Sequence, residues 1–427
     1  INYSFQYQHD VMVPLRTTPS NRPKSNRTTA SSSLVTSIIL LYTISSSQTL
    51  SLSTTTTSSS SSSSSSLPNN NNNPFTNKSP IAFGTLNPAY DTTPTAGLAN
   101  LLNSLPSGTL IDTAEKYGTD DGDAERELGS ALQFCGRTFQ KCNDDNESNN
   151  DNDNNNTPDL LLCSKFAPKP WRTSPDSVVQ ACRSSAERLG VNSIFLYQLH
   201  YSDAISQPFK IFGYVDNKDE IYWEGLAQCY HEGLIEHVGV CNYGPQNVRA
   251  AHAFFAKRNV PLVSNQINFN LMRHRSSVET KSVCDELGIR VFGYHPLGGG
   301  VLTGAYDDEW FRNTPGGFNK RKSKSTRVRW YQKKCVPVIR AVRDVASRRG
   351  KSPAQVAINW CVCKGIVPIC GARDVEQVLE AVGGGGGGGM GEDDKEGSCW
   401  RLSEMEVEEL DEASAVSAEY ARGFELI

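Results

Sequence analysis

The sequence predicts an α/β protein folded as a single (β/α)8 barrel, the TIM barrel. Three observations support this prediction: short apolar runs alternate with amphipathic segments, eight such runs occur, and polar or titratable residues end most of them. Strands that read as continuous apolar runs are typical of a parallel sheet covered by helices. Eight such units are the number that closes a parallel sheet into a barrel.

The eight predicted strands lie between residues 81 and 373. They cover residues 81–86, 109–112, 160–165, 194–200, 237–242, 261–266, 289–295 and 366–373. A doubly wound sheet is the alternative architecture, but it should carry a glycine-rich phosphate turn after its first strand. The first run continues as FGTLNPAY, which lacks that turn.

The segments between the strands have the periodicity and the end signals of helices. In 174–190, Ser174 is a candidate N-cap, Pro175 suits the first helical turn, and Val178, Cys182 and Leu189 share a face. Three further helices are predicted over 223–235, 245–259 and 276–288, each closing near Gly or Asn.

Residues 1–78 do not share this alternation. Asp10 is their only acidic residue, serine and threonine are abundant, and a serine run is followed by an asparagine run. The apolar stretch 33–44 is too short to span a bilayer but suits a signal h-region. We therefore expect residues 1–78 to be a disordered leader that targets the protein to the plastid. The alternative location is the cytoplasm. We expect no membrane segment in the mature form.

Two internal segments have no apolar period. Residues 143–157 are rich in Asn and Asp, and residues 383–397 begin with a glycine run. Such compositions bury little surface, so both are predicted to be loop insertions in a barrel domain that extends over 79–427.

Overall composition excludes several partners. The formal net charge is −4, so the chain lacks the basic surplus of a nucleic-acid-binding protein. Most of the 12 cysteines lie in apolar runs without zinc-ligand spacing, and we interpret them as reduced core residues rather than as metal ligands or a disulfide framework.

Four titratable residues are predicted to share the C-terminal mouth of the barrel, where TIM-barrel active sites are built. Asp112, Lys165 and His200 end successive strands, and Tyr117 follows Asp112 in the next loop. A nearby ammonium lowers the pKa of a tyrosine, Asp112 can pair with that ammonium, and His200 can donate to a carbonyl oxygen. We therefore expect proton delivery to a substrate oxygen.

The later strands offer groups suited to a nicotinamide cofactor, since no side chain supplies a hydride. Gln266 can bond a carboxamide, Tyr294 offers a stacking face, and the glycines of 296–304 allow backbone to approach a pyrophosphate. Arg373 near a helix N-terminus is a candidate for an additional phosphate, as in NADPH.

The ordered set IDTAEKYG, CSKF, LYQLH, GVCNYG, SNQINFNLM, YHPLGGGVLTG and PICGARDVEQ resembles the aldo-keto reductase superfamily, and FAPKPWR and CDELGI resemble its plastid members in plants and algae. The resemblance covers about 79–427, apart from the two insertions. It implies a catalytic tetrad of Tyr117, as the acid, with Asp112, Lys165 and His200. It also implies NADPH contacts at Asn242, Gln266, Tyr294, Pro296, Leu297, Gly298, Gly300, Leu302, Gly371, Arg373, Gln377 and Glu380. Ala381 stands where an adenine-binding asparagine is usual.

These features predict an NADPH-dependent reductase of small aldehydes or ketones, with pyridoxal as one candidate substrate. The alternatives are a regulatory NADPH-binding subunit similar to channel-associated β subunits, and a degenerate scaffold barrel. Substrate choice depends on loops around Trp171, 201–223 and 305–330, whose shapes the sequence does not define.

Overall fold

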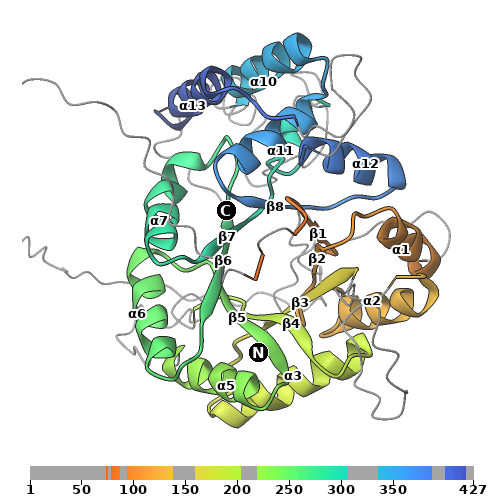
Figure 1. Cartoon of the computed structure of the whole chain (residues 1–427), viewed down its shortest axis with the longest axis vertical. Coiled ribbons are helices and arrows are strands. Elements are labelled where there is room, and N and C mark those ends of the chain that lie inside the picture. Colours follow the sequence, from red (N-terminus) through yellow and green to blue (C-terminus); the bar gives the residue numbers. More distant parts are fainter. Residues whose placement is uncertain are drawn as a thin grey trace, which may run out of the picture. The chain divides into compact units, whose positions relative to one another are not determined.

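The computed structural model describes residues 74–75, 78–86, 94–137, 159–202, 219–305, 335–386 and 400–419. Eight parallel strands form a closed barrel in which neighbours in sequence pair and β8 returns to β1 (Figure 1). The fold class is therefore the predicted one. The strands are β1 (Ala82–Gly84), β2 (Thr109–Asp112), β3 (Leu160–Phe166), β4 (Ile194–Leu199), β5 (Ile235–Cys241), β6 (Leu262–Asn268), β7 (Arg290–Tyr294) and β8 (Val367–Cys370).

Helices surround the barrel on its outer side (Figure 1). Those described are α1 (Pro94–Asn103), α2 (Asp123–Phe134), α3 (Pro175–Leu189), α5 (Asp219–His231), α6 (Pro245–Ala256), α7 (His274–Glu286), the 3-10 turn η2 (Val301–Thr303), α10 (Val336–Arg349), α11 (Pro353–Cys363), α12 (Val375–Gly384) and α13 (Glu404–Glu419). Helices α10 and α13 pack against each other, beside α11 and α7. No helix in these described ranges is long and apolar enough to cross a membrane.

Helix α3 shows how local sequence sets the bounds. Pro175 occupies the first turn, and Gly190 ends the helix in the left-handed conformation at φ 71°. Ser174 occupies the predicted N-cap position, but its side chain makes no capping hydrogen bond. A full capping box is formed instead at α11, between Ser352 and Gln355.

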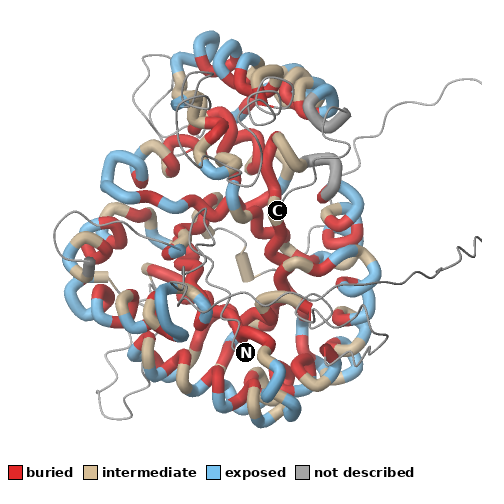
Figure 2. Tube along the Cα trace, turned by 180° about the vertical axis from the view of Figure 1, so that it is seen from behind, coloured by how far each residue is buried: buried red, intermediate tan, exposed pale blue. Residues whose placement is uncertain are grey.

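Successive side chains of a strand point alternately into the barrel and toward the helices, which produces two apolar layers. The buried residues follow the strands and the inner faces of the helices (Figure 2). On β3, Leu161 and Cys163 belong to the cluster inside the barrel, whereas Leu160 and Leu162 belong to the cluster between barrel and helices. Lys165 continues the inward series and is fully buried. The cysteines in the described part of the chain are all unpaired, and all but Cys363 are buried.

The predicted glycine-rich insertion begins later than expected. Helix α12 continues through Gly384, and Trp400 Nε1 donates to the carbonyl oxygen of Gly383 at 2.6 Å. A Cβ atom at Gly383 would lie 2.5 Å from Gln355 Nε2, and one at Gly384 would lie 2.9 Å from Ile358 Cβ. These glycines let α12 approach α11 closely, so packing overrides their low helix propensity. The insertion 143–157 lies outside the described residues.

An aromatic residue closes the N-terminal end of the barrel. Phe75, within the segment predicted as leader, makes edge-to-face contacts with Phe195 and Phe292, at centroid distances of 6.1 and 5.0 Å. Its ring also lies 6.5 Å from that of His237. The predicted boundary at residue 78 therefore falls after a residue that packs with the barrel, while residues 1–73 lie outside the description.

The Phe75→Ala variant is expected to lose about 2 kcal/mol of unfolding free energy, because a half-buried aromatic ring is removed from an apolar cluster. Urea denaturation of the full chain measures this. Phe134→Ala is the control, since that ring is 72% exposed and its loss should change stability by about 0.5 kcal/mol or less. Equal losses in the two variants would contradict a packing role for Phe75.

Candidate active site

Three predicted catalytic residues lie at the C-terminal ends of adjacent strands. Asp112 is the last residue of β2, Lys165 lies one residue before the end of β3, and His200 directly follows β4. The register pairs Asp112 with Cys163 and Lys165 with Gln198, so the side chains meet at one mouth of the barrel. Tyr117, in the loop after β2, completes the group.

Lys165 is the centre of this cluster. Its Nζ donates to Asp112 Oδ2 at 2.7 Å, to the carbonyl oxygen of Thr113 at 2.9 Å and to Tyr117 Oη at 3.0 Å. Burial is the largest single influence and by itself would lower the pKa of this ammonium, but Asp112, with smaller contributions from Tyr117, Cys163 and Cys241, raises it overall. The ammonium thus remains charged, with three acceptors for its three hydrogens.

Tyr117 differs from the sequence prediction in its acidity. Burial raises the pKa of the phenol, the Lys165 ammonium opposes this, and the Asp112 carboxylate adds to the rise. The net pKa is above the ordinary value rather than below it, because desolvation of the phenolate outweighs one ammonium that is already paired. Tyr117 is consequently protonated at neutral pH, and because Lys165 Nζ donates to Oη, the phenol hydrogen is available to another acceptor.

His200 is held as a neutral ring. Burial lowers its pKa well below the ordinary value, and the positive charges of Lys165 and Lys116 add to this. Its ring lies edge-on to Tyr117 with centroids 5.6 Å apart. The Nδ1 atom is buried without a hydrogen-bond partner among the described residues. A neutral imidazole carries one N–H and can donate it to a ligand oxygen.

The predicted carboxamide and stacking residues connect to the same cluster. Gln266 Nε2 donates to Asp112 Oδ1 at 2.8 Å, and Tyr294 Oη donates to Asn242 Oδ1 at 2.8 Å. Asn242 Nδ2 donates to the carbonyl oxygen of His200 at 3.1 Å. Asn242 also has a positive φ of 60°, a conformation in which asparagine is among the most tolerated residues. The structure thus brings the two predicted groups of residues into one network.

The glycine segment after β7 folds into consecutive tight turns. Gly298, Gly299 and Gly300 have φ values of 58°, 67° and 91°, and Leu302 N donates to the carbonyl oxygen of Leu297 at 3.1 Å. Pro296 and Leu302 are buried, so this stretch can offer a ligand mainly its backbone. Contact of this backbone with a pyrophosphate stays a prediction.

The segment after β8 and the start of α11 line an open pocket of about 370 Å³, whose lining residues are Ser352, Gln355, Asp374, Glu376, Gln377 and Glu380. Gly371 and Arg373 are exposed beside it. The start of α12, which the sequence predicts as an anion site, already holds a carboxylate. Asp374 caps the helix by accepting from Gln377 N at 2.8 Å. Gln377 Oε1 accepts from Arg373 N, and Glu380 accepts from Ser352 Oγ at 2.5 Å. Arg373 itself is exposed at this end of α12, and its predicted contact with a phosphate stays a prediction.

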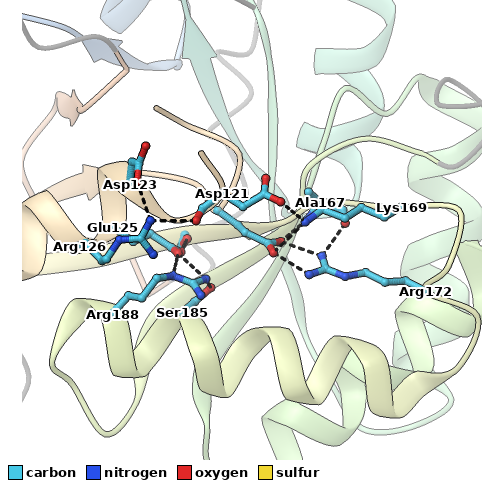
Figure 3. A network of polar contacts seen from close by, with 11 residues as sticks. Asp121, Asp123, Glu125, Arg126, Ala167, Lys169, Arg172, Ser185 and Arg188 are labelled. Atoms are coloured by element: carbon cyan, nitrogen blue, oxygen red, sulfur yellow. Dashed lines mark hydrogen bonds and ion pairs between the residues drawn. The ribbon is translucent and has the colours of Figure 1, made fainter. Parts of the chain in front are cut away.

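Some polar residues of the site were not singled out from the sequence. Glu115 and Arg172 form a buried ion pair between the loops after β2 and β3. Figure 3 shows Arg172 near Ala167 and Lys169 of the second loop. Asp219 Oδ2 accepts from Ser202 Oγ at 2.7 Å and from Tyr243 Oη at 2.8 Å, which joins the ends of β4 and β5 to α5. The sequence signal was a charged residue inside each quoted motif, IDTAEKYG for Glu115 and FAPKPWR for Arg172.

Comparison with known proteins gives the family. Residues 80–384 match the Aldo/keto reductase family. The chain belongs to the aldo/keto reductase family. Its relatives include the chloroplastic pyridoxal reductase of Arabidopsis thaliana, 37% identical over 277 residues, which cover 64% of this chain and 67% of the relative. An uncharacterised oxidoreductase of Mycobacterium tuberculosis is 32% identical over 63% of this chain and 70% of its own length.

A solved structure supports the fold of this aldo/keto reductase. The crystal structure of a thermostable aldo-keto reductase in complex with the inhibitor epalrestat matches with a TM-score of 0.53 at 20% identity, over 78% of this chain and 94% of that chain. The family and its relatives show that the protein is an oxidoreductase of the carbonyl-reducing class. The relatives are named as reductases and oxidoreductases, which gives the regulatory-subunit alternative no support.

Proposed function

We propose that this aldo/keto reductase uses NADPH to reduce the carbonyl group of small aldehydes or ketones to an alcohol, with Tyr117 as the general acid. The observation that carries the proposal is the buried Lys165 ammonium, which bonds Asp112 and Tyr117 at 2.7 and 3.0 Å at the barrel mouth. Charged groups are rarely buried without a functional or structural partner, and here they surround a phenol that retains its proton.

Each residue of the cluster has a defined part in the proposed step. NADPH, when bound, supplies a hydride to the carbonyl carbon. Tyr117 gives its proton to the carbonyl oxygen, and the Lys165 hydrogen bond stabilises the phenolate that forms. Neutral His200 donates to the same oxygen and orients it. Asp112 holds the ammonium, and its other oxygen accepts from Gln266 Nε2 across the barrel.

The described residues fit a dinucleotide. Tyr294 and Asn242 lie beside the catalytic cluster for the nicotinamide end, and the left-handed turn at 298–300 presents backbone for a pyrophosphate. We assign the adenosine end to the start of α12, where Arg373 supplies a cation and the Asp374 carboxylate, which caps the same helix, opposes an anion. Pro296, Leu297, Leu302 and Gly371 would contribute backbone or apolar contact, and Gln377 and Glu380 polar contact.

The first test is oxidation of NADPH by the purified chain with a panel of small aldehydes that includes pyridoxal. Pyridoxal is chosen because the Arabidopsis relative is named for it. Turnover with any aldehyde supports the proposal. Tight NADPH binding without reduction of any aldehyde would favour a regulatory role, and failure to bind NADPH would exclude the proposal.

A plastid location is part of the proposal. It is supported by the acid-poor, hydroxyl-rich composition of residues 1–78 and by the chloroplastic relative. Fusion of the full chain to a fluorescent protein tests it, and a uniform cytoplasmic signal would contradict it.

Arg373→Ala is expected to raise the KM for NADPH about 10- to 100-fold and to leave the KM for NADH nearly unchanged. A charge-assisted hydrogen bond to a phosphate contributes about 1.5–3 kcal/mol. NADH lacks the 2′-phosphate, so its binding should not depend on this bond. The neighbouring charged residues Asp374, Glu376 and Glu380 are acidic, so Arg373 is the cation at the start of α12. Arg249→Ala is the control, because Arg249 is exposed on α6 and pairs with Glu286. Equal effects on both coenzymes would place the phosphate elsewhere.

A further inference from the structure

The loop that carries Tyr117 is tied to the loop after β3 by one buried carboxylate, that of Glu115. Its two oxygens accept from Arg172 Nη1 and Nη2 at 2.7 and 2.6 Å, an arrangement that fixes both distance and plane. Lys169 Nζ lies 3.3 Å from the same carboxylate, and Ala167 N donates to it at 3.4 Å. All these donors follow Lys165 within seven residues.

The cationic partners are themselves held in place. Arg172 Nη1 also donates to the carbonyl oxygen of Ala167 at 2.7 Å, and its guanidinium lies 4.8 Å from the ring centre of Phe166, the last residue of β3. Tyr222 Oη of α5 donates to the carbonyl oxygen of Arg172. Lys169 Nζ also contacts Asp121 Oδ2 at 2.5 Å. The loop 113–122 is thus attached at both ends to a segment that cannot easily move.

The same two chain segments form the contact on which proton transfer depends. Tyr117 lies two residues after Glu115, and Lys165 lies two residues before Ala167. Glu115 N donates weakly to the carbonyl oxygen of Lys165 at 3.4 Å, and Ala124 N donates to that of Tyr117 at 3.2 Å. A shift of the loop relative to β3 would therefore lengthen the Lys165 to Tyr117 hydrogen bond.

We propose that Glu115 is a positioning residue for Tyr117: its carboxylate clamps the loop after β2 to Arg172 and Lys169 and so keeps the phenol within hydrogen-bond distance of Lys165. The inference rests on the proposed role of Tyr117 as general acid. It assigns to the clamp an effect on the reaction step rather than on cofactor affinity. Burial opposes ionisation of Glu115, but Arg172 and Lys169 outweigh it and lower its pKa, so the clamp is charged at neutral pH.

Glu115→Gln tests the clamp, because the substitution keeps the size of the side chain but removes the charge that holds Arg172 and Lys169. Glu125→Gln is the matched control. Glu125 is also a buried glutamate, pairs with Arg188 at 2.7 Å and accepts from the Ser164 hydroxyl. It anchors α2 to β3 and α3, and its partner Arg188 lies apart from Arg172 in Figure 3.

We expect Glu115→Gln to lower kcat about 10- to 100-fold with an unchanged KM for NADPH, as for a misplacement of about 1 Å at the reacting groups. Glu125→Gln should lose stability but keep kcat. Amide hydrogen exchange in residues 113–122 should rise in Glu115→Gln and not in Glu125→Gln. In a Tyr117→Phe background, Glu115→Gln should have no further effect on the residual rate.

The readouts separate the failure of this proposal from failure of the proposed function. Equal losses of kcat in the two glutamine variants, or unchanged exchange in 113–122 for Glu115→Gln, would overturn the clamp. If the wild-type chain reduces no aldehyde, the proposed function fails, and the exchange comparison still decides whether Glu115 holds the loop. A lowered NADPH affinity in Glu115→Gln would also overturn the assignment to the reaction step.

Discussion

The Tyr117→Phe variant is expected to bind NADPH like the wild type but to lose about 10²- to 10⁴-fold in kcat, the usual contribution of a positioned general acid. The substitution removes only the hydroxyl that accepts from Lys165, and it leaves Lys165 paired with Asp112 and Thr113. Cofactor binding by fluorescence titration and steady-state rates with one aldehyde measure the two effects. Tyr201→Phe is the control, because its ring also contacts His200, at 5.3 Å, while its hydroxyl faces Pro168. A Tyr117→Phe enzyme with near wild-type kcat would show that the proton comes from another group.

The raised pKa of Tyr117 adds a test of pH dependence. Because the folded phenol keeps its proton above the ordinary range of tyrosine, its contribution as an acid should not decline between about pH 6 and about pH 9. Had Lys165 lowered the pKa toward neutrality, as the sequence suggested, the reductive kcat would fall within that range. His200 is neutral over the same range, since its pKa is lowered, and should add no inflection.

The strand ends could be predicted from the sequence, whereas the balance of charge at the mouth could not. Placing Asp112 and Lys165 at the ends of two parallel strands needs only the alternation of strands and helices. The acidity of Tyr117 depends instead on how far the site is buried and on whether Lys165 is already paired. The contact between Gln266 and Asp112 spans opposite parts of the barrel and has no local signal.

Tertiary packing also explains where composition misled. Glycines in 383–384 have poor helix propensity, yet close contact with Gln355 and Ile358 of α11 favours glycine there, above all at Gly384. Phe75 lies at the edge of a polar tract, but Phe195 and Phe292 offer it an apolar surface. Asp374 is a typical N-cap residue, so the sequence can indicate that a helix starts there. The cap places a carboxylate where an anion would bind near Arg373, and this becomes clear only from the structure.

Lys165→Met should abolish most turnover and also lower stability by about 3–5 kcal/mol, because it leaves the buried Asp112 carboxylate without its cation. Asp112→Asn should destabilise for the opposite reason, since it leaves a buried ammonium without its anion. Both changes also remove the charge arrangement that stabilises a phenolate at Tyr117. Thermal or urea unfolding gives the stabilities, and aldehyde reduction gives the rates.

A variant that combines Lys165→Met with Asp112→Asn separates the contribution of this pair to stability from its contribution to turnover. With both charges removed, its stability loss should be smaller than the sum of the single losses by about 1–3 kcal/mol, the range found for directly interacting residues. Its kcat should stay as low as that of Lys165→Met, because no donor remains for Tyr117 Oη. Additive stability losses would mean that Asp112 and Lys165 do not stabilise each other in the fold. Recovery of kcat together with stability would mean that the ammonium serves only the fold, which would leave Tyr117 without the partner that the proposed proton transfer requires.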